Sequence, residues 1–447
     1  MLYYGAYSEL QTSLAENSHC AIGAGCYHRA RIRSFKRLWQ RTHIVRLVQD
    51  VIIAVFTLQV ITAIVLQAVS VLRRRHKHEV SFPHLQLDEV RVGENCLQLY
   101  GYGRDLYAAM LEAIDCARES IYLETYIWKG DTVGRELKEH LAKKAEQGVD
   151  VYVIFDAFAN LVVPRAFKEF PSSIHMLEYQ SLHRPWHVLD PRRLALDHRK
   201  LLVVDGSVGF IGGYNLGDLY ATEWRDTHLR IRGPAAADLA HSFVSFWNRS
   251  CGEGKEITRH YVRHFDSFIT VRSNDAFRLT FPIRDMYIEA IDRAEHSILL
   301  TNAYFVPDHI LLEALKAAAA RGVDVRVLVP WYSNHIVADW LARGYFTECL
   351  EGGIRVFGYT YAMLHAKTCT VDGQWVTLGT ANLDRLSSIG NFEINVEIYS
   401  AQLARQMQDL FYSDTAGVFE QTLPEWKSRH WYIKLSERIM APLRFLL

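Results

Sequence analysis

The sequence predicts an α/β fold built from two repeated halves, preceded by a membrane-spanning helix. Three observations support this prediction: an octad of the form His-x-Lys-x-x-x-x-Asp that occurs twice, an alternation of helical and apolar strand-like segments, and an uncharged apolar run near the N-terminus. The chain has 447 residues, 49% of them hydrophobic, which is enough for two or three domains with sizeable cores. Alternating helices and buried strands are typical of α/β domains.

The apolar run comprises residues 51–72, which carry no charged side chain. As a helix it would extend about 33 Å, enough to cross the hydrocarbon core of a bilayer. Arg73 follows directly and begins a basic cluster that suits the headgroup region. The run lies too far from the N-terminus for a cleaved signal peptide, so we expect an uncleaved, single-pass anchor in the cell (inner) membrane. A buried or interfacial helix is the alternative, and basic residues on both sides leave the orientation open.

The remaining chain is divided around this run. Residues 1–50 form a basic N-terminal tail and residues 73–96 a linker. The two halves are expected at 97–255 and 256–420. Residues 421–447 mix Trp, Tyr, Lys and Arg with Leu and Ile, which favours an amphipathic segment at a membrane interface, with a packed terminal helix as an equal alternative.

Each half repeats the same order of elements around its octad. Hydrophobic periodicity predicts helices at 106–118, 133–147, 286–295 and 310–321, and strands at 121–128, 149–155, 298–305 and 323–329. The octads at 198–205 and 365–372 are strand-like, and each leads through a glycine turn into a return strand. Because residues i and i+2 of a strand face the same way, each octad should project its His and Lys together.

The two octads supply two histidines and two lysines, His198 with Lys200 and His365 with Lys367. A phosphodiester is anionic, so its cleavage needs cations to spread the charge, a nucleophile, and a proton donor for the leaving alkoxide. A neutral imidazole can attack phosphorus to form a phosphohistidine, while a second, protonated imidazole serves the leaving oxygen. The octads therefore predict two catalytic half-sites that need no metal ion and no cofactor.

Two further pairs of residues keep the spacing of the repeat. Asn215 and Asn382 follow their octad histidines at one common offset, and Asp226 and Glu393 follow them at another. The amides can donate hydrogen bonds to phosphoryl oxygens. An acid on the far ring nitrogen of a histidine fixes its tautomer, as in a catalytic triad. We expect these four supporting residues to complete the half-sites, one Asn and one acid for each.

The aspartates that close the octads, Asp205 and Asp372, are counted with the catalytic candidates because they belong to the repeated motif. Each precedes a glycine, so a structural role in a turn is an equally open interpretation. Metal binding by the histidines is disfavoured, because the neighbouring lysines would repel a cation.

Composition narrows the class of substrate. The chain carries 50 basic and 50 acidic residues, for a formal net charge of zero. Nucleic-acid enzymes usually show a basic excess, so nucleic acid is disfavoured as a partner. The seven cysteines are scattered and predict reduced thiols.

Residues 159–197 form a long connection with no counterpart of this length in the second half, and our hypothesis is a lid or lipid-headgroup loop.

With its doubled octad, the sequence resembles the phospholipase D superfamily from about residue 97 to residue 419. Finer motifs are similar to the bacterial cardiolipin synthase branch: Phe210-Ile-Gly-Gly-Tyr-Asn215, Trp224-Arg-Asp-Thr-His-Leu-Arg230, Tyr304-Phe-Val-Pro-Asp308, Leu364-His-Ala-Lys367, Gly379-Thr-Ala-Asn-Leu-Asp384 and Asn391-Phe-Glu393. The resemblance implies two phospholipase D-like α/β halves with pseudo-twofold symmetry and one active site at their interface. It also implies that His198 is the nucleophile and His365 the acid/base, a choice that chemical symmetry alone does not make.

The implied reaction is phosphatidyl transfer between two molecules of phosphatidylglycerol, with release of glycerol and formation of cardiolipin. Water as the acceptor would give a phospholipase D-type hydrolase of phospholipid, which is the alternative, and a nuclease is less favoured. The expected partners are an anionic phospholipid and the membrane. The residues leave open the acceptor alcohol, the acyl preference and the oligomeric state, with a homo-oligomer possible.

Overall fold

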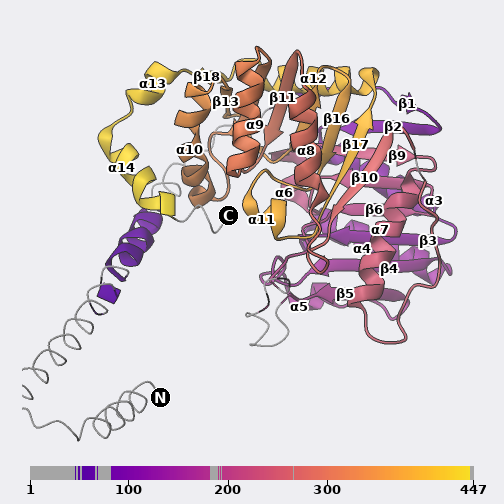
Figure 1. Ribbon diagram of the computed structural model, residues 1–447. Coiled ribbons are helices and arrows are strands. Elements are labelled where there is room, and N and C mark those ends of the chain that lie inside the picture. Colours follow the sequence, from indigo (N-terminus) through magenta and orange to yellow (C-terminus); the bar gives the residue numbers. More distant parts are fainter. Residues whose placement is uncertain are drawn as a thin grey trace, which may run out of the picture. The chain divides into compact units, whose positions relative to one another are not determined.

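Two eight-stranded sheets with matching strand orders form the body of the molecule (Figure 1). The computed structural model describes residues 46, 49–50, 53–65, 68, 82–181, 190, 192, 194–264 and 266–442. The chain divides into two compact units, Met1–Ile64 and Val65–Leu447, and both sheets belong to the second.

The first sheet has the order β1-β2-β9-β7-β6-β3-β4-β5. Its strands are β1 Val90–Val92, β2 Asn95–Tyr100, β9 His228–Arg232, β7 Val208–Gly212, β6 Leu201–Val204, β3 Ser120–Thr125, β4 Asp150–Asp156 and β5 Ile174–Tyr179. The second sheet has the order β10-β17-β16-β15-β11-β12-β13-β18. Its strands are β10 Ile269–Asn274, β17 Glu393–Tyr399, β16 Trp375–Gly379, β15 Lys367–Val371, β11 Ser297–Asn302, β12 Asp324–Pro330, β13 Arg355–Tyr359 and β18 Phe419–Gln421. From β2 and from β10 onward, seven strands correspond one to one, which confirms the duplicated α/β architecture.

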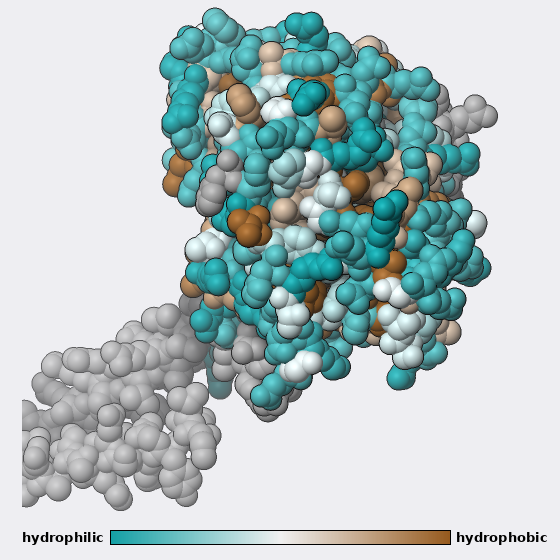
Figure 2. Space-filling model, turned by 90° about the vertical axis from the view of Figure 1, so that its right-hand side faces the viewer, coloured by the Kyte–Doolittle hydropathy of each residue, from teal (hydrophilic) through white to brown (hydrophobic). Residues whose placement is uncertain are grey.

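Helices cover both sheets. Those of the first half are α3 Gly103–Cys116, α4 Thr132–Glu146, α5 Arg165–Lys168, α6 Asp218–Thr222 and α7 Ala236–Ser250. Those that follow are α8 Pro282–Arg293, α9 His309–Ala320, α10 Ile336–Glu351, α11 Arg385–Ile389, α12 Ala401–Thr415, α13 Leu423–Lys427 and α14 Trp431–Met440. One hydrophobic cluster joins α7 and strands of the first sheet to α12 and strands of the second, so the two halves share a core. Figure 2 shows a surface on which hydrophilic residues predominate and hydrophobic ones form only small separate patches.

The predicted helices and strands are confirmed with shifts of a few residues at their ends. The predicted helix 106–118 is α3, for example, and the predicted strand 323–329 is β12. Helices α7, α10 and α12 were not predicted, because they lie outside the repeated blocks on which the prediction rested. Boundaries shift because helix and strand ends are set by capping and pairing, which periodicity does not report.

Two predictions about local structure are corrected. The octads are not strands throughout: β6 begins only at Leu201 and β15 at Lys367, so both histidines precede their strand. The connection 159–197 is not one continuous loop, since it contains α5 and also β5, which pairs in parallel with β4, and its role as a lid or lipid-headgroup loop stays a prediction. Residues 182–189, 191 and 193 of this connection lie outside the described part of the chain.

The N-terminal unit is described only in part. Residues 53–65 are helical, and apolar side chains along them are exposed, among them Ile53, Phe56 and Ile64. Most of the predicted tail, the rest of the predicted span and residues 73–81 of the linker lie outside the described residues. Within the residues that are described, no helix is both long and apolar enough to cross a membrane.

The C-terminal segment contains α13 and α14. Trp426 of α13 is almost fully buried in the core of the second half, against Trp331 and Phe346, so this part is a packed terminal element. Helix α14 exposes Trp431 and Tyr432. Residues 443–447 lie outside the described part. Helix α13 is therefore packed on the second half, and the membrane-interface alternative for α14, with its exposed aromatic side chains, stays a prediction.

Candidate active site

The two octad histidines lie at the junction of the halves, and each is held there by the backbone of the other half. The amide of His198 donates to the carbonyl of Phe392 at 3.1 Å, and the amide of His365 donates to the carbonyl of Arg225 at 2.7 Å. Strand β8 (Trp224–Arg225) pairs in parallel with β14 (Met363–Leu364) to fix the second of these contacts. The residues directly before β6 and β15 therefore form contacts between the two halves.

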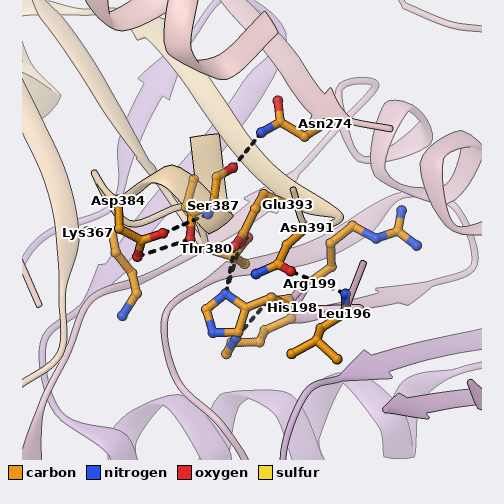
Figure 3. A network of polar contacts seen from close by, with 12 residues as sticks. Leu196, His198, Arg199, Asn274, Lys367, Thr380, Asp384, Ser387, Asn391 and Glu393 are labelled. Carbon is orange, nitrogen blue, oxygen red and sulfur yellow. Dashed lines mark hydrogen bonds and ion pairs between the residues drawn. The ribbon is translucent and has the colours of Figure 1, made fainter. Parts of the chain in front are cut away.

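Each imidazole also meets a carboxylate from the opposite half. His198 Nδ1 lies 3.0 Å from both carboxylate oxygens of Glu393, as Figure 3 shows, and His365 Nδ1 lies 2.6 Å from Asp226 Oδ2. Both acids are buried. Our expectation that each half-site is completed by its own acid is therefore wrong. Glu393 directly follows Phe392, and Asp226 directly follows Arg225. The backbone hydrogen bond that holds each histidine therefore also brings the acid of the opposite half to its ring.

The ring orientation follows from these contacts. In each histidine Nδ1 is engaged by the acid, which leaves Nε2 as the nitrogen that can meet a substrate. Aromatic rings limit the movement of both imidazoles: Tyr126 stands edge-on to His198 with centroids 4.7 Å apart, and Trp224 lies 4.9 Å from His365. Tyr304 is a second aromatic neighbour of His365, at 6.2 Å.

The two octad lysines are buried beside the histidines. Lys200 Nζ donates to the carbonyl of His198 at 2.7 Å, and Lys367 donates to the carbonyl of His365. Burial lowers the pKa of Lys200 to about 7 and that of Lys367 to about 8. Glu393 and Asp226 oppose this effect by stabilising the charged ammonium groups.

Both imidazoles are held in the neutral form. Burial, followed by the charge of Lys367, lowers the pKa of His365 to about 3. Burial and the charges of Lys200 and Lys367 hold the pKa of His198 well below its ordinary range. A buried imidazolium would be costly next to two ammonium groups, so the site is prepared for an anion, not for further positive charge.

The two acids differ in protonation. Burial raises the pKa of Glu393 to about 8, against the opposing charge of Lys200, and Thr380 Oγ1 donates a 2.5 Å hydrogen bond to its Oε2. For Asp226, burial would also raise the pKa, but Lys367 and His365 outweigh it and the pKa is lowered. Asp226 is therefore a carboxylate beside His365, whereas Glu393 and His198 form a pair that is easily neutral. The half-sites are equivalent in position and unequal in charge.

The two asparagines are buried, each three residues beyond the return strand of its half, β7 or β16. Asn215 Oδ1 accepts the amide of Ile127 at 3.2 Å, which orients its side-chain NH2 group away from that amide. Asn382 Oδ1 is buried and has no hydrogen-bond partner among the described residues. Their predicted donation to phosphoryl oxygens stays a prediction.

The aspartates that close the octads directly follow β6 and β15, so they lie at the opposite ends of these strands from the histidines. Asp205 is five residues beyond Lys200, a distance of about 16 Å along an extended chain. Its carboxylate accepts three backbone amides, from Arg118, Glu119 and Ser120, at 2.8–2.9 Å. Asp372 accepts the three equivalent amides of the second half, at 2.8–2.9 Å. Both adopt left-handed backbone angles, φ 50° and 52°. Counting them as catalytic is thus corrected: each ties the helix–strand loop to the turn after the core strand.

Asp205→Ala should therefore reduce stability and not chemistry. We expect the free energy of unfolding to fall by about 2–4 kcal/mol, because three amides lose their acceptor and alanine is strained in the left-handed region. Asp205→Asn, which keeps one acceptor oxygen and tolerates this region, should lose less. Denaturation midpoints, combined with initial turnover at a temperature where both variants are folded, test this. A folded Asp205→Ala chain with turnover reduced a hundredfold would restore the catalytic interpretation.

Sequence reasoning did not identify several residues that build the site. Thr380 and the aromatic residues Tyr126, Trp224 and Tyr304 were not singled out. Trp224 and Tyr304 begin two of the motifs on which the family resemblance rests, but neither was assigned a role in the site. The position of Tyr126 directly after a buried strand, at the edge where the octad residues lie, was the signal available for it.

Comparison with known proteins places this site in a family. A family model described as "Cardiolipin synthase, PLD-like domain" matches residues 110–247 and 287–415. A cardiolipin synthase of Listeria monocytogenes is 32% identical over 378 residues, covering 78% of this chain and 76% of that protein. The major cardiolipin synthase of Bacillus subtilis is 32% identical over 371 residues, with the same coverage. The crystal structure of a phosphatidylserine synthase of Haemophilus influenzae is similar in fold, with a TM-score of 0.58, 16% identity, and coverage of 82% of this chain and 95% of that one.

Proposed function

The chain belongs to the cardiolipin synthase family with phospholipase D-like domains, and we propose on this premise that it transfers a phosphatidyl group between two phosphatidylglycerol molecules. Glycerol is released and cardiolipin is formed. The observation that carries the proposal is the meeting of both histidine–lysine pairs at one junction, with an acid from the opposite half on each imidazole. The phospholipid-synthesising relatives make a lipid the better substrate than a nucleic acid.

In the first step, Nε2 of His198 attacks phosphorus of the first phosphatidylglycerol. The new P–N bond forms as the P–O bond to the headgroup glycerol breaks, and His365 gives its proton to the departing glycerol oxygen. In the second step, a primary hydroxyl of a second phosphatidylglycerol attacks phosphorus, its proton passes to His365, and the P–N bond breaks. The P–O bonds broken and formed are of the same kind, so concentrations decide the net direction.

Charge controls these steps. Lys200 and Lys367 stabilise the non-bridging oxygens of the transferring group, in a buried environment that strengthens the interaction. The pKa of His365 is about 3 before substrate binds. The negative charge of a bound phosphodiester raises this pKa, so His365 takes up its proton when substrate binds. Asp226 holds that imidazolium at 2.6 Å. His198, whose pKa is held down by burial and the lysines, stays unprotonated and nucleophilic.

Activity should fall on the alkaline side of neutrality. Burial lowers the pKa values of Lys200 and Lys367 to about 7 and 8, and a lysine is charged below its pKa, so the positive charge of the free site is lost as pH rises through this range. We expect kcat/KM to decrease at least tenfold per pH unit through this range, and more steeply above pH 8, where both lysines lose their charge. In Lys200→Arg the guanidinium stays charged, so any activity that remains should lose less on the alkaline side. A profile that is flat to pH 10 would contradict the assignment of the lysines.

The direct test is incubation of purified full-length chain with phosphatidylglycerol vesicles, with products identified by mass spectrometry. Cardiolipin and glycerol in equal amounts are expected. Phosphatidic acid without cardiolipin would overturn the transferase proposal in favour of the phospholipase D-type hydrolase, because water would then be the acceptor at the same phosphorus.

A membrane location completes the proposal, with residues 51–72 as a single anchor in the cell membrane. The uncharged apolar run supports it, as do the exposed apolar side chains of residues 53–65. The chain should remain in the membrane fraction after alkaline carbonate extraction. Release into the supernatant would rule out the anchor and leave the chemistry of the active site unaffected.

A further inference from the structure

The loop that follows β4 presents three apolar side chains to solvent. Phe158 is 63% exposed, Leu161 69% and Val162 82%. Isolated exposed apolar residues are common on soluble proteins, but three within five positions of one loop form a local apolar projection.

The backbone of this loop is held firmly, so the exposure follows from the fold. Asp156, which is buried, accepts the amide of Ala159 at 2.9 Å. Asn160, also buried, accepts the amide of Trp128 at 2.9 Å and donates to the carbonyls of Tyr126 and Asp156 at 2.7 and 2.8 Å. Because these contacts fix the turn, the apolar side chains cannot fold back into the core without breaking buried hydrogen bonds.

The same anchoring residues connect the loop to the nucleophile. The second carboxylate oxygen of Asp156 accepts the amide of Asp197 at 3.0 Å, directly before His198. Tyr126, whose carbonyl receives Asn160, packs its ring against the imidazole of His198. The loop is therefore part of the wall of the active site.

Other exposed apolar residues stand near the same junction. Leu219 of α6 and Leu386 of α11, 37% and 43% exposed, are equivalent positions of the repeat, because each follows its site asparagine at the same offset. Tyr220 of α6 packs on Trp224, the aromatic neighbour of His365, and α11 begins directly after Asp384, whose charge acts on Lys367. Tyr332, 54% exposed, follows β12 as Phe158 follows β4. The apolar residues thus come from both halves around one site.

The charges in and after the loop indicate which kind of surface the loop can bind. Residues 157–164 carry no acidic side chain, and Arg165, which follows them, is exposed, whereas Lys168 is paired with Glu178 at 3.2 Å. An apolar projection without acidic residues, followed by an exposed arginine, is complementary to an anionic bilayer, in which acyl chains lie beneath a layer of phosphates.

We propose that residues 157–164 dock the active site onto an anionic phospholipid bilayer, with Phe158, Leu161 and Val162 entering the boundary between headgroups and acyl chains. This inference rests on the proposed function, since a site that draws both substrates from a bilayer gains by lying against it. The substrate phosphate can then reach His198 while its acyl chains remain in lipid.

Crosslinking to lipid tests the contact without relying on activity. A benzophenone amino acid replaces Val162 in the full-length chain, which is reconstituted in phosphatidylglycerol vesicles and irradiated. The matched control places it at Val262, which is 86% exposed on a loop whose Tyr261 contacts Ser120, at the opposite end of β3. A phospholipid adduct is expected at 162, at least fivefold more abundant than at 262. Equal labelling, or an adduct to a second protein chain at 162, overturns the proposal.

Turnover supplies a second measurement on full-length protein. The ratio of turnover on phosphatidylglycerol vesicles to turnover of dispersed short-chain phosphatidylglycerol should fall at least tenfold in Val162→Asp and stay within twofold in Val262→Asp. Ratios that are equal in the two variants overturn the docking role. If the unmodified chain turns over neither substrate, the proposed function fails, while the crosslinking result still decides the docking of the loop.

Discussion

His198→Ala is expected to lower phosphatidyl transfer by about 10⁴-fold or more, the largest effect of any single substitution in the chain. Without Nε2 of His198 there is no atom in position to form the P–N bond. A direct exchange between two lipids would have to align both in line at one phosphorus, which the two-step route avoids. The fold should be retained, because the contact with Phe392 comes from the backbone amide of residue 198 and not from the ring.

Two measurements check this expectation. Initial rates with phosphatidylglycerol vesicles compare His198→Ala with His241→Ala, a variant at an exposed histidine on α7 that should retain full turnover. Rapid acid-free quenching followed by mass spectrometry should find a phosphatidyl group on the peptide that contains His198 in the unmodified chain. More than 1% residual turnover in His198→Ala, or the adduct on the peptide of His365, would refute the assignment of the nucleophile.

The second large effect concerns the acids that act across the halves. Asp226→Asn should lower turnover by about 10³–10⁴-fold, because an amide can hold His365 in the wrong tautomer and no longer stabilises the imidazolium. Glu393→Gln should have a smaller effect, since Glu393 already tends to hold a proton: burial raises its pKa to about 8. Rates of both single variants at pH 7 give the comparison.

A double-mutant cycle distinguishes pairing across the halves from pairing within them. Asp226 contacts His365, so Asp226→Asn should add less than threefold to the loss already caused by His365→Ala. If Asp226 served His198 of its own half, the two losses would multiply, and the double variant would be about a thousandfold slower than His365→Ala. Multiplied losses would therefore contradict the geometry at the junction.

Much of the fold could be predicted from the sequence, because the duplication presents each pattern of helix and strand twice. A single helix–strand pattern is ambiguous, but the same order of helices and strands recurs around each octad, and β4 and β12 lie within a residue of the two strands that this order predicts. Helices α7, α10 and α12 had no such internal match. The sequence predicts strands over the whole of both octads, whereas the histidines pair with the other half before the strand begins.

The residue types of the site could be predicted for the same reason, but the sequence did not show which acid contacts which histidine. The sequence by itself determined which residue types are present in duplicate: two histidines, two lysines, two asparagines and two acids at matching spacing. The sequence left Asp205 and Asp372 open between a catalytic and a turn-forming role, because a motif does not show which end of a strand faces the substrate.

Only the tertiary structure decided which residues act together. Asp226 follows His198 along the chain but contacts His365, and Glu393 follows His365 at the same offset but contacts His198. Spacing along the chain is a local property, whereas a contact between halves depends on the pairing of β8 with β14 and on the shared core. The difference in protonation between Glu393 and Asp226 is likewise tertiary, because burial and the nearest lysine or histidine set the pKa of each acid.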